Sequence, residues 1–209
     1  MNEEKYNGYE TPQWELTGTQ PEDGSYEVRR YPAAHWTSTE EQRPSVDAPS
    51  SNSFWRLFNY IRGDNSTKEK IDMTVPVIQQ VSGQSCPFSD TTYKMMFYVP
   101  PKHQSSPPDP SNPDVKTEKM EETTAYVRTF SGRPKGRDFQ KEAGNLYDSL
   151  KKNSVDVSNI DMNIFYAVTY DSPFRLFFRR NEVWLLPKKK EGEETKQAAQ
   201  GNEMEQQAE

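Results

Sequence analysis

One short pattern occurs twice in this 209-residue chain, and it limits the possible folds more than any other feature. The sequence VRRY at 28–31 returns as VRTF at 127–130, an offset of 127 − 28 = 99 residues. After each copy the same order follows: a helical pattern, a strand interrupted near a proline, and a last strand that ends at a proline. Two copies of strand, helix, strand and strand predict an α+β domain in which a curved antiparallel sheet or barrel carries two helices outside.

Two stretches have the apolar spacing i, i+3, i+4, i+7 of a helix that buries one face. The first covers 53–62 and precedes Gly63, a residue suited to a helix C-terminus. The second follows the turn-like segment 132–137. The residues of the two stripes are Phe54, Leu57, Phe58 and Ile61, then Phe139, Ala143, Leu146, Tyr147 and Leu150.

Strands are predicted where apolar and polar residues alternate or where β-branched and aromatic residues form short runs. Pro32 interrupts the first run, so a strand, a kink and a second strand are expected around it. Pro76 restricts its own strand to a sheet edge or a bulge. The expected strands cover 26–31, 33–39, 71–81, 93–99, 123–131, 163–170 and 182–187.

Composition separates one folded unit from polar segments. The apolar share of 32% is low for a fully compact chain of this length. Proline, serine, glutamine and acidic residues collect at both ends and in the segment 100–114. We therefore predict an extended N-terminal segment at 1–22, held to the surface by Trp14, one domain over 23–187, and a disordered acidic tail at 188–209.

Charge and cysteine content restrict the partners and the compartment. The net charge of −6 argues against general nucleic-acid binding, because affinity for phosphate needs a concentrated basic surface. No apolar run reaches the ~18 to 20 residues of a membrane span, and 1–10 lacks the apolar core of a signal peptide. The single cysteine, Cys86, fits a reducing compartment. A cytoplasmic location is expected, so the glycosylation sequon at Asn65 is interpreted as a coincidence.

Few residues suit acid-base or nucleophilic catalysis. The two histidines are His35 and His103, and no sequence context supports a pair of His35 with Cys86. A zinc site needs three or four clustered ligands, and 132–137 lacks the Lys-Ser/Thr ending of a phosphate-binding loop. The chain is therefore expected to be a binding protein and not an enzyme.

Four segments together resemble the SOUL family of haem-binding proteins. The most specific are MTVPV at 73–77 and RRNEVWL at 179–185, supported by SYEVRRY at 25–31 and MFYVP at 96–100. The resemblance covers nearly the whole predicted domain. It implies a distorted eight-stranded antiparallel β-barrel with two flanking helices, and non-covalent binding of haem or another tetrapyrrole in a hydrophobic groove beside the first helix.

Transferred residue by residue, the resemblance places groove-facing residues at Phe54, Phe58 and Asn59, and a basic residue at Arg175. A macrocycle is a flat apolar disc with two carboxylates on one edge. Two phenylalanine rings four residues apart on a helix can face such a disc, and a guanidinium can bond to a propionate. The alternative is that Phe54 and Phe58 fill the core.

The position of an iron ligand departs from part of the family. A histidine proposed there as a ligand would fall at Arg30, and arginine does not ligate iron. His35 is the nearest candidate, and its alternative is a partly exposed strand residue. Cys86 precedes a proline, as in haem-regulated proteins with a thiolate ligand, and its alternative is an ordinary turn residue.

A second function stays open at this point: a protein-interaction module that keeps the fold without physiological haem binding. The acidic surface, the amphipathic second helix and the PxxP character of 100–114 favour it, since such segments dock on aromatic grooves of partners. The alternative for 100–114 is a solvated loop.

Overall fold

The computed structural model describes residues 5–44, 52–83, 91–172 and 174–188. One antiparallel sheet of nine strands dominates this part, in the order β3-β4-β9-β11-β10-β6-β7-β5-β8. The strands are β3 (Glu15–Leu16), β4 (Glu27–Tyr31), β5 (Ala34–Arg43), β6 (Val77–Ser82), β7 (Thr91–Tyr98), β8 (Lys116–Met120), β9 (Thr123–Phe130), β10 (Ile164–Thr169) and β11 (Asn181–Leu185). Two further strands, β1 (Lys5–Tyr6) and β2 (Tyr9–Glu10), pair with each other. The helices are α1 (Ser53–Ile61), α2 (Gly136–Lys152) and the short 3-10 helix η1 (Pro101–His103).

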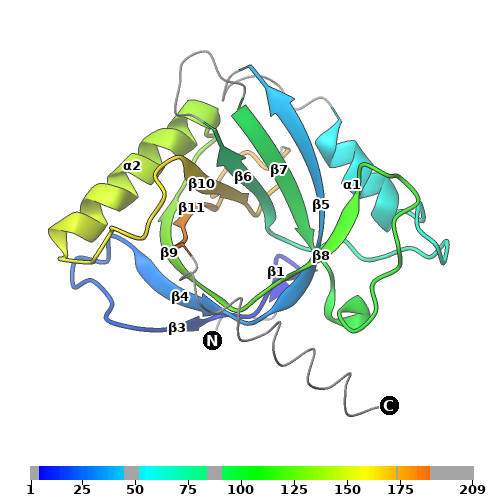
Figure 1. Ribbon diagram of the computed structural model, residues 1–209, viewed down its shortest axis with the longest axis horizontal. Helices are drawn as coiled ribbons and strands as arrows, with labels where there is room; N and C mark the ends of the chain where they lie inside the picture. The colour runs from blue at the N-terminus through cyan, green and yellow to red at the C-terminus, as the bar shows by residue number, and fades with distance from the viewer. Residues whose placement is uncertain (1–4, 45–51, 84–90, 173, 189–209) are drawn as a thin grey trace, which may run out of the picture.

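The sheet curls, and the two long helices lie at opposite ends of the curl (Figure 1). Tyr93 packs in the same cluster as α2, whereas Met95 and Phe97 pack with α1. These three residues alternate along β7, so their side chains share one face of the sheet. Both helices therefore cover the outer face. The inner face holds a second cluster, which includes Tyr31, Trp36, Ile78, Met96, Tyr98 and Trp184.

Two chain crossings tie the ends of the curled sheet together. Only Pro32 and Ala33 separate β4 from β5, yet these strands lie at opposite ends of the strand order. The segment 121–122 joins β8 to β9 in the same way, and Figure 1 shows β8 continuing into β9 along the base of the molecule. The pairs Tyr31 with Thr123 and Ala34 with Met120 flank the crossings. The predicted kink at Pro32 is confirmed, and it is the point where the chain leaves one end of the sheet for the other.

The sheet differs from the eight-stranded barrel that the sequence led us to expect. Its strand order has two ends, β3 and β8, so it is an open half-barrel. Pro32 lacks an N–H and cannot extend a ladder across the gap between the ends. The ninth strand is β3, a two-residue strand that pairs with Arg29 and Arg30 of β4. The coarser prediction, a curled antiparallel sheet with two outer helices, is confirmed.

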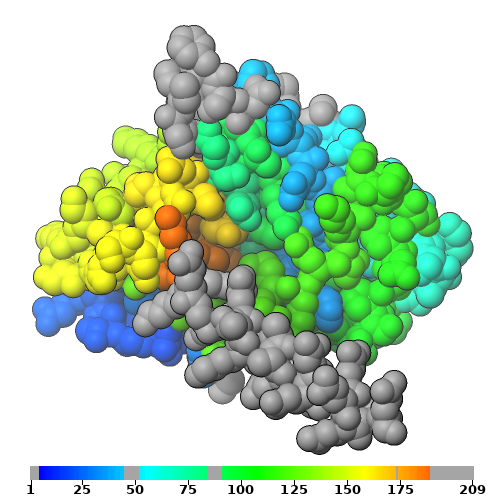
Figure 2. All heavy atoms as spheres, viewed as in Figure 1, coloured from blue at the N-terminus to red at the C-terminus, as the bar shows by residue number. Residues whose placement is uncertain are grey.

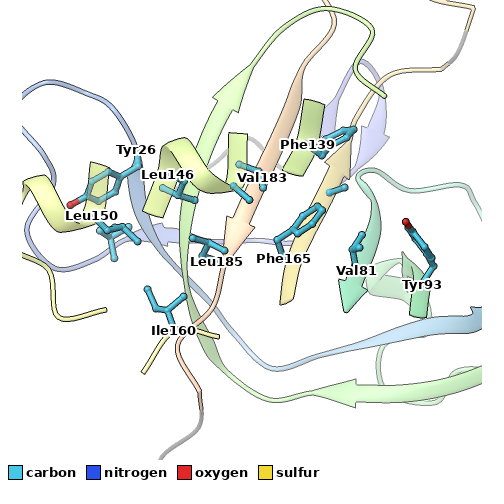
Figure 3. Packing of buried hydrophobic residues seen from close by; sticks show 13 residues of the cluster. Tyr26, Val81, Tyr93, Phe139, Leu146, Leu150, Ile160, Phe165, Val183 and Leu185 are labelled. Atoms are coloured by element: carbon cyan, nitrogen blue, oxygen red, sulfur yellow. The ribbon is translucent and has the colours of Figure 1, made fainter. Parts of the chain in front are cut away.

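The apolar stripe of α2 packs on the outer face as its spacing predicts. Leu146 and Leu150 are fully buried and point toward Val183 and Leu185 of β11 (Figure 3). Phe139 and Ala143 complete the buried stripe. Burial of a leucine side chain stabilises a fold by about 1.5–3 kcal/mol, so this contact fixes β11 beneath the helix.

The strand predicted at 71–81 begins later than expected. β6 starts at Val77, directly after Pro76, because proline has no N–H to donate to a ladder. β8 was not predicted. Its sequence KTEKM has no apolar alternation, and its backbone pairs on one side only, as an edge strand of charged residues can.

A buried carboxylate organises the polar part of the inner face. Glu182 is 0% exposed, and the guanidinium of Arg29, 1% exposed, donates from Nη1 to both of its carboxylate oxygens at 3.1 Å. Trp184 Nε1 donates at 2.8 Å, Tyr170 Oη at 3.1 Å and Arg180 Nε at 2.9 Å. Arg180 Nη2 also donates at 2.6 Å, so six hydrogen bonds compensate the desolvation of this carboxylate.

The tyrosines beside this carboxylate predict a loss of stability in alkali. Burial, and then the negative charge of Glu182, raise the pKa of Tyr31 and Tyr170 above the ordinary value of about 10. A group whose folded pKa is raised contributes stability that is present below its unfolded pKa and is lost as the pH rises toward the folded pKa. Each tyrosine held neutral costs about 1.4 kcal/mol at about pH 11, so these two alone should lower the free energy of unfolding by about 3 kcal/mol between about pH 9 and about pH 11.

Urea unfolding at the two pH values measures this loss. Tyr170→Phe removes one titrating group, so the variant should lose less stability across the same interval even though it lacks the hydrogen bond to Glu182. An equal free energy of unfolding at both pH values would contradict the assignment.

The sequon residue Asn65 is fully buried. Its Nδ2 donates to the carbonyl oxygens of Tyr60 at 3.0 Å and Glu69 at 2.9 Å, and its Oδ1 accepts from the Glu69 N–H and the Thr67 hydroxyl. Both amide hydrogens are used and no face is open to solvent, so this asparagine is a structural residue of the turn after α1 and not a glycan acceptor in the folded chain.

Candidate functional site

Helix α1 is held on the outer face by one half of its surface. Leu57, Tyr60 and Ile61 are buried against Met95 and Phe97 of β7, together with Ile71 and Val115. Arg56 forms an ion pair with Asp114 at 3.0 Å. The helix ends before Gly63, whose φ of 114° favours glycine. These contacts fix the helix so that its other half faces outward.

That outward half carries three aromatic rings, which we call the aromatic shelf: Phe54, Trp55 and Phe58. Phe54 and Phe58 stack with ring centroids 5.6 Å apart and an interplanar angle of 18°. Trp55 stands nearly perpendicular to both, at 84° and 81°. Phe54 also contacts the buried ring of Phe97 edge to face at 5.6 Å, which gives the shelf a rigid base.

The shelf is open to solvent. Phe54 is 36% exposed and Trp55 is 59% exposed, while Phe58 is half-buried. Leu57, Tyr60 and Ile61 fill the core beneath α1, while Phe58 packs partly against them and Phe54 lies mostly outside, so the core-filling alternative describes Phe58 only in part. Exposed aromatic rings anchored on a helix are suited to contact with a flat apolar ligand.

A cation lies at the C-terminal end of the shelf. The guanidinium carbon of Arg62 is 5.6 Å from the centroid of Phe58, and Arg62 is exposed. Among the described residues, Arg62 has no carboxylate partner. It can therefore bond to an anionic group of a ligand that lies on Phe58. Neither Trp55 nor Arg62 was singled out from the sequence, although they lie three residues before and four residues after Phe58, spacings that place side chains on one face of a helix.

The other residues predicted by resemblance occupy different settings. Asn59 is exposed on α1. Arg175 lies in the β10–β11 loop, where its Nη1 bonds to Asp171 Oδ1 at 2.7 Å and its Nε donates to the Phe177 carbonyl at 3.1 Å. Arg175 is thus bonded within its own loop, whereas Arg62 lies beside the rings with no carboxylate partner among the described residues.

The candidate iron ligands are not gathered at the shelf. His35 is half-buried on β5, with its Nδ1 2.8 Å from the Gln104 carbonyl oxygen. Arg30, at the position where a family histidine would fall, is exposed and pairs with Glu15 and Glu122. Cys86 lies outside the described residues. Within residues 5–44, 52–83, 91–172 and 174–188, no group of three or more His, Cys, Asp or Glu could hold a metal ion.

The inside of the half-barrel is too full for a large ligand. The cavity lined by Tyr31, Trp36, Ile78 and Trp184, among others, leaves about 20 Å³ for the centre of a water molecule. That is room for about one water. A shallower hollow of about 300 Å³ lies at the β3–β4 edge, beside Trp14. Glu15, Glu122 and Arg30 line it, and Arg30 pairs with both carboxylates, so the lining keeps a net negative charge that disfavours an anionic ligand.

The proline-rich segment after β7 is packed on the body of the molecule. The Pro108 carbonyl accepts a hydrogen bond from the Tyr60 hydroxyl at 2.8 Å, and His103 is buried with its Nδ1 3.0 Å from Glu69 Oε1. The space-filling view shows the green surface of this segment next to the cyan surface of α1 (Figure 2). These contacts support the last turn of α1, and they differ from the solvated loop considered from the sequence.

No helix in the described parts of the chain is long and apolar enough to cross a membrane.

Comparison with known proteins gives a consistent result. Residues 9–186 match the family model described as SOUL heme-binding protein. The chain is 38% identical over 182 residues to human Heme-binding protein 2, covering 86% of each chain. It is 36% identical over 188 residues to the Mus musculus Heme-binding protein 2, covering 90% of each. It is 30% identical over 182 residues to the Mus musculus Heme-binding protein 1, covering 87% of this chain and 94% of the relative.

Solved structures show a similar fold at much lower sequence identity. A crystal structure of a hydrolase from Listeria innocua has a TM-score of 0.51 and 10% identity, and the match covers 78% of this chain and 90% of that chain. A likeness at this identity concerns the architecture alone.

Proposed function

The chain belongs to the SOUL heme-binding protein family, and from that premise we propose that it binds haem or a related tetrapyrrole non-covalently on the aromatic shelf of α1, as a carrier or buffer without catalytic activity. The observation that carries the proposal is the stacked pair Phe54 and Phe58, open to solvent on α1, with Arg62 at its end, a cation that has no carboxylate partner among the described residues. A cytoplasmic location, expected from the sequence, is part of the same proposal.

The shelf fits the chemistry of the ligand. Phe54 and Phe58 would contact the apolar face of the macrocycle, and Trp55 would border it. Arg62 would bond to a propionate, and Arg175 would contribute if its bond to Asp171 exchanges. When bound, the group would supply a metal-centred chromophore, and the described residues supply apolar contact and charge.

The magnitudes allow binding without a bond to iron. Covering ~400 Å² of macrocycle at about 25 cal/mol per Å² gives roughly 10 kcal/mol before ordering costs. If ordering costs remove several kcal/mol, about micromolar affinity remains. His35 and Cys86 are therefore not needed for the proposed binding, and they remain proposals as iron ligands.

Iron-free protoporphyrin IX distinguishes binding on the aromatic shelf from binding through a bond between the protein and iron. Hemin titration should give a saturable Soret change, and iron-free protoporphyrin IX should bind within about tenfold of hemin, because both present the same disc and propionates. Absorbance and quenching of tryptophan fluorescence measure the two affinities. Met162→Ser, which changes an exposed apolar residue that is not part of the shelf, is the matched control and should bind like the wild type.

Two results would contradict the proposal. A hemin titration that never saturates, or equals that of buffer, would remove haem binding altogether. Saturable hemin binding with no binding of iron-free protoporphyrin would show that the iron and a protein ligand, and not the shelf, hold the group.

A further inference from the structure

The loop between β10 and β11 exposes four apolar side chains together. Phe174 and Phe178 are each 90% exposed, Phe177 is 73% and Leu176 is 66% exposed. We call residues 174–178 the apolar loop. Single exposed apolar residues are common on protein surfaces, but four within five consecutive positions form a patch that normally marks an interaction site.

Hydrogen bonds hold this loop in place from beneath. Asp171, with a side chain 2% exposed, bonds through Oδ1 to Arg175 at 2.7 Å and accepts the Arg180 N–H through Oδ2 at 2.7 Å. Arg179 Nη2 donates to the Asp171 carbonyl at 3.2 Å. Tyr6 and Asn7 of the N-terminal hairpin also bond to the Asp171 carboxylate at 3.2 Å. The backbone that carries the four exposed apolar side chains is therefore held in place by these bonds.

One residue of the loop has an unfavourable backbone conformation. Phe178 has a φ of 53°, in the left-handed region that a bulky side chain rarely adopts. Residues are kept in such conformations where the surrounding structure requires it, often at sites of function. In this conformation the ring of Phe178 lies at the surface and is 90% exposed, although burial of an apolar ring is favourable.

The exposed charges in and directly after the apolar loop are positive. Arg175, Arg179 and Arg180 lie in and after it, and the sequence has no acidic residue between Asp171 and Glu182. The carboxylates of Asp171 and Glu182 are 2% and 0% exposed, whereas the side chains of Arg175 and Arg180 are 36% and 32% exposed. Arg175 and Arg180 pair with these buried carboxylates, and their guanidinium groups stay partly exposed beside the apolar side chains.

We propose that the apolar loop docks this protein on anionic lipid bilayers. Phe174, Leu176, Phe177 and Phe178 insert at the boundary between headgroups and acyl chains, and the arginines beside them meet lipid phosphates. Four separately exposed apolar side chains with arginines beside them favour an anionic bilayer as the occupant, because its acyl chains accept the apolar groups and its phosphates accept the guanidinium groups. The proposal does not depend on haem binding.

Vesicle co-sedimentation of the full chain, without added haem, tests the proposal. The wild type should sediment with vesicles of mixed phosphatidylserine and phosphatidylcholine, and less with pure phosphatidylcholine or at high salt. Phe174→Ser combined with Phe178→Ser should reduce the bound fraction roughly tenfold, because two exposed rings are lost from the inserted tip. Leu16→Ser combined with Met162→Ser, a pair of exposed apolar residues elsewhere, should bind as the wild type does.

Every result decides for or against the loop. Circular dichroism and thermal unfolding of the serine variant should match the wild type, since the changed side chains are exposed; if this variant misfolds, Phe178→Ser alone is used in its place. A wild type that stays in the supernatant with both kinds of vesicle overturns the proposal, as does a loop variant that sediments as well as the wild type. Loss of hemin binding by the loop variant, with no vesicle binding by the wild type, would assign the loop to the haem site and also overturn it.

Discussion

Replacing Glu182 by leucine is expected to lower the free energy of unfolding by about 3–5 kcal/mol, the usual cost of leaving a buried charge without its partner. The guanidinium of Arg29 is 1% exposed and gives two hydrogen bonds to this carboxylate. Its remaining carboxylate partner is Glu27 at 2.6 Å, which is 47% exposed and so screened by water. The substitution also removes the acceptor of Tyr170 and Trp184.

Urea unfolding followed by tryptophan fluorescence measures this loss. Glu142→Leu is the matched control, because Glu142 forms an ion pair with Arg128 at 2.7 Å but both side chains are partly exposed; the loss should stay within about 1 kcal/mol. Arg29→Met combined with Glu182→Leu should recover much of the stability, since no buried charge then remains unpaired. A Glu182→Leu protein as stable as the Glu142→Leu protein would show that the buried pair does not stabilise the fold.

The largest effect on ligand binding is expected at the aromatic shelf. Phe54→Ala combined with Phe58→Ala should raise the Kd for hemin about 100-fold, because losing ~100 Å² of apolar contact costs about 2.5–3 kcal/mol. Alanine favours helix, and the buried anchors Leu57, Tyr60 and Ile61 are unchanged, so α1 should persist. Absorbance titration in the Soret region measures the affinity, and circular dichroism checks the helix.

A second pair of substitutions makes this test specific. Phe174→Ala with Phe177→Ala removes the same two rings from the β10–β11 loop and should change the hemin Kd much less than the α1 pair does. If the α1 pair binds hemin within about threefold of the wild type, a difference of under 1 kcal/mol, the shelf is not the binding surface.

Spacing in the sequence predicted the helices well. The stripe of α2 is buried at Phe139, Ala143, Leu146 and Leu150, as its 3.6-residue period requires. The stripe of α1 was only partly right. Leu57 and Ile61 are buried, but Phe54 is not. The N-terminal turn of α1 lies at the end of the outer face, where the ring of Phe54 contacts Phe97 edge to face. Periodicity identifies the apolar face of a helix and not how far the sheet beneath it extends.

Long-range contacts decided what the sequence could not. The edge strand β8 has charged residues at Lys116, Glu118 and Lys119, and only its pairing with β5 makes it a strand. The role of Glu182 depends on Arg29, 153 residues away, so no local pattern could reveal it. Arg175 differs, because the carboxylate that binds it belongs to Asp171, only four residues earlier in the chain.

The crossings at Pro32–Ala33 and 121–122 have a consequence for how the chain acquires its structure. They place β4 beside β9, where Glu27 pairs with Val127 and Tyr31 with Thr123, separations of 127 − 27 = 100 and 123 − 31 = 92 residues. The pair β6 and β7 is close in sequence and can form early. The pairing of β4 with β9 must wait until a loop of nearly half the chain closes. Folding should therefore be slow, on the order of milliseconds to seconds. The partly folded chain, with β4 and β9 still unpaired, is the state most exposed to aggregation.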